Sequence, residues 1–254
     1  MFYNIKVYVY SILLVIGTVF PLRKAKKLAQ KKHINSIDDE LFQTPHTVAQ
    51  KIVHTTKTPV YVEGKDHLPE GPALFVANHQ GLFDILALIG FLGKPIGFIA
   101  KKEIKKIPIV KQWMELLNCV FIDRNDRRQS VKAINQGIRN LKNGHSMVIF
   151  PEGTRRGGRQ LNPFKPGSLR MAFKAKVPIV PVTIDGTYKI LEEGSGRVQP
   201  STIYLTIHAP IWPEDYEGKK TAQLVSAIEK TIAASLKKPF NESESDPHQT
   251  SAMP

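Results

Sequence analysis

His79 and Asp84 lie five positions apart in the run NHQGLFD, a spacing at which a turn can bring an imidazole and a carboxylate together. The run follows ALFVAN, which is typical of a buried strand, and an apolar helical pattern comes after it. Such a carboxylate fixes the imidazole tautomer and stabilises the imidazolium formed when the ring accepts a proton. We therefore predict that His79 is a general base oriented by Asp84. The alternative is that His79 only ends the strand and Asp84 only caps the helix.

The same spacing occurs between His33 and Asp38, so the spacing alone is weak evidence. That second pair follows a run of lysines, which is typical of a solvated surface. The pair in NHQGLFD is favoured because it is expected at the carboxyl end of a strand, where α/β folds bind their ligands.

Three further runs place polar or proline residues at the ends of later predicted strands. CVFIDR ends in Arg124, FPEGTRRGGR carries Glu152 and Arg155 on a turn with several glycines, and VPIVPV places prolines in or beside a strand. Arginine suits phosphate because its planar guanidinium donates two hydrogen bonds at once. A single arginine is more often a solvated surface residue. Four such runs at one edge of a sheet favour a binding site.

Seven short runs rich in β-branched and aromatic residues predict the strands that position these side chains. They are PVYVEG, ALFVAN, IGFIA, CVFID, SMVIF, IVPVTI and TIYLTIH. Helical patterns are expected over 82–92, from a cap at Ser130 to near Gly144, and over 167–176 and 219–237. The alternation predicts an α/β fold, with a mixed, largely parallel sheet surrounded by helices and an N-terminal membrane-associated helical segment.

Residues 1–50 are predicted to form that membrane-anchoring segment, ahead of an α/β domain over 51–238 and a disordered polar tail over 239–254. Residues 1–32 carry seven lysines and arginines and no acid. The uncharged run over 7–22 would reach about 24 Å as a helix, short of a hydrocarbon core of about 30 Å. It therefore either spans the bilayer as a short helix or enters one leaflet. The alternative is an ordinary buried core helix.

Both membrane interpretations put the basic cluster at the anionic cytoplasmic face of the cell membrane. After the cluster an amphipathic helix is expected to continue to about Gln50, with a break at Pro45.

The composition fits a folded domain with an anionic partner. The chain has 254 residues, of which 42% are hydrophobic and 23% charged, so disordered, collagenous and multi-pass membrane proteins are excluded. Its single cysteine excludes a disulfide framework. A formal net charge of +14 favours nucleic acid, an acidic membrane surface or phosphorylated substrates as partners.

The runs NHQGLFD, CVFIDR, FPEGTR and VPIVPV, in this order, resemble the four motifs of the glycerolipid acyltransferases. The set is most similar to the 1-acylglycerol-3-phosphate acyltransferases, and the resemblance covers residues about 58–210. It implies an α/β domain attached to membranes through its N-terminus. It also implies acyl transfer from a thioester, acyl-CoA or acyl-carrier protein, to the 2-hydroxyl of lysophosphatidate, giving phosphatidate for phospholipid biosynthesis.

The resemblance also implies roles for single residues. It makes His79 the base and Asp84 its partner, with the VPIVPV run beside the acyl chain. The residues that it implies for substrate binding are Lys101, Arg124, Glu152, Gly153, Thr154 and Arg155. Among these, Glu152 would bind the glycerol part, Arg155 would hold the phosphate, and Lys101 would add phosphate affinity.

No cofactor and no metal are predicted, because the sequence has no nucleotide-binding glycine motif and no metal-ligand spacing. Two alternatives remain open. One keeps the chemistry and changes the acceptor to another lysophospholipid or glycerol phosphate. The other is a non-catalytic basic protein that binds membranes or nucleic acid; it accounts for the charge but not for the residues at strand ends, and no nucleic-acid module is recognisable. The predicted partners are therefore the acyl donor, lysophosphatidate and an anionic membrane surface, and not nucleic acid.

Overall fold

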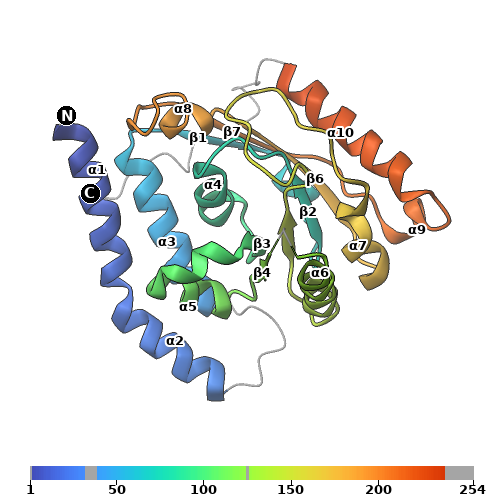
Figure 1. Ribbon diagram of the computed structural model, residues 1–254, viewed down its shortest axis with the longest axis horizontal. Helices are drawn as coiled ribbons and strands as arrows, with labels where there is room; N and C mark the ends of the chain where they lie inside the picture. The colour runs from blue at the N-terminus through green and yellow to red at the C-terminus, as the bar shows by residue number, and fades with distance from the viewer. Residues whose placement is uncertain (1, 32–38, 124–125, 238–254) are drawn as a thin grey trace.

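The computed structural model describes residues 2–31, 39–123 and 126–237. Within them, seven strands form one sheet in the order β1-β7-β6-β2-β5-β3-β4 (Figure 1). The strands are β1 (Val60–Glu63), β2 (Leu74–Ala77), β3 (Gly97–Lys101), β4 (Val120–Ile122), β5 (Met147–Ile149), β6 (Ile179–Asp185) and β7 (Ile203–Ile207). All seven predicted strands are confirmed.

Five neighbouring strands of the sheet, from β6 to β4, run parallel to one another. At the other edge β7 is antiparallel to β6, and β1 is parallel to β7. The predicted mixed, largely parallel sheet is therefore confirmed. The carboxyl ends of β6, β2, β5, β3 and β4 share one edge, and the motifs NHQGLFD, CVFIDR and FPEGTR lie at this edge, at the ends of β2, β4 and β5. The expectation that all four motifs meet there is wrong for VPIVPV, because residues 177–182 lead into β6 and form its first part.

Helices cover both faces of the sheet (Figure 1). The helices are α1 (Phe2–Gly17), α2 (Val19–Lys31), α3 (Asp39–Thr55), α4 (Phe83–Phe91), α5 (Pro108–Leu116), α6 (Arg127–Lys142), α7 (Arg170–Ala175), α8 (Tyr188–Leu191), α9 (Pro213–Tyr216) and α10 (Thr221–Lys237). Short 3-10 helices lie at Lys65–His67, Lys102–Lys106 and Pro166–Leu169.

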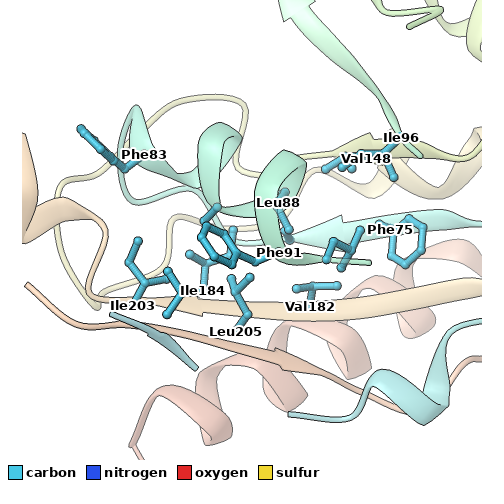
Figure 2. Packing of buried hydrophobic residues seen from close by; sticks show 14 of the residues in the cluster. Phe75, Phe83, Leu88, Phe91, Ile96, Val148, Val182, Ile184, Ile203 and Leu205 are labelled. Carbon is cyan, nitrogen blue, oxygen red and sulfur yellow. The ribbon is translucent and has the colours of Figure 1, made fainter. Parts of the chain in front are cut away.

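Strand β2 shows why its sequence is apolar throughout. Alternate side chains of a strand point to opposite faces, and all four residues of β2 are buried. Phe75 and Ala77 join the core under α3 and α4, whereas Leu74 and Val76 join the core under α6, α7 and α10. Figure 2 shows the first of these cores, with the α4 side chains packed among those of the strands.

Two predicted helix boundaries are wrong. Helix α6 is capped by Asp126 and not by Ser130, because the Asp126 carboxylate accepts the backbone N–H groups of Arg128 and Gln129 at 2.8 and 3.1 Å. Pro45 does not break a helix but lies inside α3. The proline removes one backbone hydrogen bond, and α3 continues because its buried side packs against the core.

Helices α1 and α2 lie along one side of the domain and are separated at Thr18 (Figure 1). One side of α1 packs on the core through Tyr3, Val7 and Leu14. At the break, the buried Thr18 hydroxyl accepts a hydrogen bond from Trp113 Nε1 of α5 at 2.9 Å. By length and composition, the helical stretch Phe2–Gln30 is long and apolar enough to cross a membrane.

The opposite side of α1, together with Phe20 in the first turn of α2, is exposed and apolar. Among the described residues, nine of the thirteen exposed large hydrophobic side chains lie between positions 2 and 20. Seven of these recur three or four positions apart or side by side and so form one stripe, which we call the apolar stripe. Its members are Phe2, Ile5, Val9, Ile12, Leu13, Ile16 and Phe20.

The tail predicted over 239–254 lies outside the described residues.

Candidate active site

The turn between β2 and α4 closes around the carboxylate of Asp84, which is fully buried. Its Oδ2 accepts hydrogen bonds from His79 Nδ1 at 2.7 Å, from the Gln80 N–H at 2.7 Å and from the Gly81 N–H at 2.9 Å. Because this oxygen accepts from two backbone donors, it meets the imidazole as an acceptor too, which assigns the ring proton to Nδ1. The Nε2 atom of His79 is then the nitrogen that can accept a proton.

The ring of His79 is held in place on more than one side. Its side chain is 10% exposed, and the imidazole stacks on Phe150 with ring centroids 4.0 Å apart and planes inclined by 15°. The backbone carbonyl of His79 accepts the Arg156 N–H at 3.3 Å. The structure therefore fixes both the rotation of the ring and the path of its backbone. The predicted pairing of His79 with Asp84 is present in the fold.

Glu152 connects this turn to the loop that follows β5. The residue is 4% exposed, and its two carboxylate oxygens accept the His79 N–H and the Asn162 N–H, each at 2.7 Å. Burial raises the pKa of Glu152, and the two backbone donors and the nearby His79 oppose this rise. In this arrangement the carboxylate holds the two loops together. Binding of the glycerol part by Glu152 stays a prediction.

The other residues predicted to bind substrate lie at the same edge of the sheet. Gly153 has a positive φ of 76°, a backbone conformation that residues with side chains rarely adopt, so glycine suits this turn. Thr154 and Arg155 follow it with exposed side chains, and Lys101 is exposed at the end of β3. Arg124, like His33 and Asp38, lies outside the described residues.

Two residues that the sequence did not single out also contact the turn. Thr187 is fully buried and its hydroxyl donates a hydrogen bond to Asp84 Oδ1. Glu192 accepts the Leu82 N–H at 2.7 Å, and burial raises its pKa while this bond and Arg155 lower it. A side chain at Gly81 would overlap with the Glu192 carboxylate, so close packing accounts for this glycine. Both residues are more than one hundred positions from the turn, and no local pattern marks them.

An ion pair secures the loop after β5 to the end of β6. Arg159 donates to the two oxygens of Asp185 at 3.1 and 2.6 Å, and this bond raises the pKa of Arg159. The Gln80 side chain reaches the same carboxylate at 3.4 Å. The FPEGTRRGGR loop is therefore tied to both the His79 turn and β6. Among the described residues, no three His, Cys, Asp or Glu side chains are grouped to hold a metal ion.

The family model called Acyltransferase matches residues 59–185, which include the whole His79 turn and the Glu152 loop. The chain belongs to the acyltransferase family. The fold of this acyltransferase is similar to the crystal structure of the 1-acyl-sn-glycerophosphate acyltransferase PlsC from Thermotoga maritima. The TM-score is 0.79 at 29% identity, and the match covers 95% of this chain and 97% of the other.

Relatives with known names agree with this placement. A chloroplastic 1-acyl-sn-glycerol-3-phosphate acyltransferase of Arabidopsis thaliana is 36% identical over 75% of this acyltransferase and 54% of its own length. One from Brassica napus is 34% identical, with 75% and 56% covered. A probable enzyme of the same name from Mycoplasma pneumoniae is 34% identical, with 71% of each chain covered. The chain thus spans little more than half the length of the two plant relatives.

Proposed function

We propose that this acyltransferase transfers an acyl group from a thioester to the 2-hydroxyl of 1-acylglycerol-3-phosphate, giving phosphatidate. The observation that carries the proposal is the buried His79–Asp84 pair at the carboxyl ends of parallel strands. The names of the relatives support the choice of acceptor, since three of them are 1-acyl-sn-glycerol-3-phosphate acyltransferases or probable ones. The donor is acyl-CoA or acyl-carrier protein, and the product enters phospholipid biosynthesis.

In the proposed reaction His79 Nε2 removes the proton from the acceptor hydroxyl while the oxygen attacks the thioester carbonyl. A C–O bond forms and the C–S bond breaks, so the sulfur leaves as a thiolate. The imidazolium of His79 then returns the proton to that sulfur. Between the two transfers Asp84 stabilises the imidazolium through the hydrogen bond to Nδ1. A thioester is already activated, so the reaction needs no covalent enzyme intermediate.

The acceptor phosphate is proposed to bind to Arg155, with Arg124 and Lys101 adding positive charge around it. The exposed side chains of Arg155 and Lys101 support this role, because an acceptor can reach them at the edge of the sheet. A guanidinium forms two parallel hydrogen bonds to phosphate. Thr154 lies beside Arg155 in the same loop and is proposed to contact the acceptor with it.

Thiol release tests the proposed reaction. The protein is incubated with lysophosphatidate and acyl-CoA or acyl-carrier protein of several chain lengths, and a thiol reagent reports the freed sulfur. We expect thiol release that depends on the acceptor, and its loss in His79→Ala. Other lysophospholipids serve as alternative acceptors. If no donor releases thiol with any acceptor, the proposal fails and the non-catalytic basic protein is favoured.

We also propose that residues 1–50 anchor the enzyme at the cytoplasmic face of the cell membrane. The apolar stripe supports insertion into lipid, since large exposed apolar patches mark interaction sites. The lysines of α2 support contact with anionic headgroups, at about 1 kcal/mol for each basic residue near such a surface. Sedimentation with vesicles of anionic or neutral phospholipid tests this. If the protein sediments with neither kind of vesicle, the proposed anchoring is contradicted.

A further inference from the structure

The two oxygens of Asp84 have unequal surroundings. Oδ2 accepts three N–H groups, from His79, Gln80 and Gly81. Oδ1 accepts one hydrogen bond among the described residues, from the hydroxyl of Thr187. Asp84 and Thr187 are both fully buried, so water does not replace that bond. The hydroxyl is therefore the partner on which the second oxygen depends.

The fold directs Thr187 to this place by a glycine turn at the end of β6. Gly186 has a φ of 91°, and a Cβ on it would overlap with the backbone carbonyl of Thr202 in the segment that leads into β7. Before the turn, Asp185 is engaged by Arg159; after it, Thr187 faces Asp84. Thr187 lies two positions beyond the segment matched by the family model, which ends at residue 185.

We propose that Thr187 is a positioning residue of the reaction, whose hydroxyl holds the Asp84 carboxylate in the rotation that presents Oδ2 to His79. This inference rests on the proposed role of His79 as the base. Without the hydroxyl, Oδ1 is left buried with no donor, and a buried acceptor without a partner is unfavourable. The carboxylate then turns or draws its other donors out of place. Small displacements of this kind cost large factors in rate.

Loss of the hydroxyl should also change the pH dependence of the reaction. A hydrogen bond to a carboxylate stabilises its charge, so removing the bond makes Asp84 more basic. A more basic carboxylate holds the imidazolium of His79 more tightly, or takes a proton itself. In either case a higher pH is needed to reach the active form, in which the His79 imidazole is neutral and Asp84 is ionised. Among the described residues, Glu152 and Glu192 are charged groups that interact with Asp84, and Arg155 lies near Glu192; the variants leave all three unchanged.

Three substitutions at Thr187 separate the hydroxyl from the volume of the side chain. Thr187→Val keeps the shape and removes the hydroxyl, Thr187→Ser keeps the hydroxyl and removes a methyl group, and Thr187→Cys supplies a weaker donor. Thr183→Val is the matched control. Thr183 is also buried and lies in β6, the strand that leads to Thr187, but its hydroxyl bonds to His208 at 2.8 Å and not to the site.

We expect Thr187→Val to lower kcat by about 10- to 100-fold, with the acceptor KM changed less than about threefold. The acid limb of the pH profile of kcat/KM should move to higher pH. Thr187→Ser should recover kcat to within about threefold of the unchanged protein, and Thr187→Cys should lie between. Thr183→Val should leave the pH profile unchanged. A folded state is confirmed for each variant by its thermal melting curve.

The order of the kcat values of the Thr187 variants decides whether the inference holds. If the kcat of Thr187→Val equals or exceeds that of Thr187→Ser, the side chain acts by its volume and the inference is wrong. The inference is also wrong if the acid limb of the pH profile of Thr187→Val does not move. Titration of the His79 imidazole by NMR gives a readout that does not need activity. If the unchanged protein releases no thiol but Thr187→Val shifts that titration and Thr187→Ser does not, the proposed function fails while the contact stands.

Discussion

Asp84 is a charged group with no exposed surface and four hydrogen bonds, whereas Phe2 is an aromatic side chain that is 91% exposed. The edge of the sheet and helix α1 thus depart from the usual distribution of side chains in opposite directions. A buried charge is unfavourable unless every part of it is bonded. A contiguous exposed apolar surface is unfavourable in water unless something covers it. Each departure indicates where the molecule meets something other than water.

The two regions also differ in how much of the chain is needed to build them. The surroundings of Asp84 come from the turn itself and from the connection after β6, with 103 positions between Asp84 and Thr187. The apolar stripe needs only one helix and a repeat of three or four residues. The surroundings of Asp84 depend on tertiary structure, whereas the apolar stripe depends on the spacing of apolar residues along one helix. Substitutions should therefore affect them in different ways.

Asp84→Asn should give the largest effect, because it removes the charge while keeping nearly the same shape. The asparagine oxygen can still accept the backbone N–H groups, but it stabilises the imidazolium of His79 less. We expect kcat to fall by about 10²- to 10⁴-fold, the usual contribution of general-base catalysis. Asp215→Asn is the control, since Asp215 accepts the Trp212 N–H in a helix cap. Activity of Asp84→Asn within tenfold of the unchanged protein would contradict the assignment.

His208 tests whether a half-buried polar group away from the motifs serves stability alone. Burial lowers the pKa of His208 from an ordinary value near 6.5 to about 4, with a smaller contribution from His67. Between these pH values the unfolded chain binds the extra proton, so the free energy of unfolding should fall as pH falls from about 6.5 to 4. The upper limit of this loss is about 3 kcal/mol.

The measurement is denaturant unfolding at several pH values, for the unchanged protein and for His208→Gln. The variant should lose less stability across this window, while its kcat at neutral pH stays the same. Identical pH dependence in the two proteins would show that His208 does not contribute the change.

Arg155→Ala should affect binding of the acceptor and not the chemical step. A hydrogen bond to a charged group contributes about 1.5–3 kcal/mol, so we expect the acceptor KM to rise by about 10- to 100-fold. The donor KM should change little. Arg155→Lys should also be impaired because an ammonium does not form the paired hydrogen bonds of a guanidinium. Phosphate-free monoacylglycerol is the control acceptor. The same loss on both acceptors would assign Arg155 to the donor or to the fold.

The smallest effects should come from substitutions in α1. Changes on its apolar stripe should affect membrane binding, and changes on its packed side should affect the stability of the fold. Ile12→Ser, on the apolar stripe, should weaken binding to anionic vesicles by about tenfold, because part of one isoleucine's apolar area is lost. It should leave the melting temperature unchanged. Val7→Ala, on the packed side, should lower the melting temperature and leave vesicle binding unchanged. If the two variants show the same pattern, the sides of α1 do not have separate roles.

The sequence predicted the strands well because β2 and β6 are buried on both faces, and β2 and the first four residues of β6 are continuous apolar runs. It also predicted the His79–Asp84 pair, because the whole turn lies within six residues. Helix ends were harder to predict. Asp126 and Ser130 are both capping residues, and the choice between them depends on where the chain leaves β4.

Thr187 and Glu192 could not be predicted, because their contacts depend on strand order. Nothing in the local sequence places β6 next to β2, and only that pairing brings the end of β6 beside the turn. Glu152 was identified, but its bonds to two backbone N–H groups were not. The sequence shows which residues are present at the strand ends. It does not show which of them bond to one another.

The break at Thr18 has a consequence for the kinetics. Trp113 fixes the junction of α1 and α2 to α5, so the apolar stripe keeps a constant orientation relative to the His79 turn. With the anchoring that we propose, a protein held in a leaflet by this stripe carries its proposed reaction centre at a constant height above the lipid surface. Its acceptor then arrives by lateral diffusion in two dimensions. The rate follows the mole fraction of acceptor in the leaflet, and diluting that leaflet with neutral lipid slows turnover at an unchanged bulk concentration.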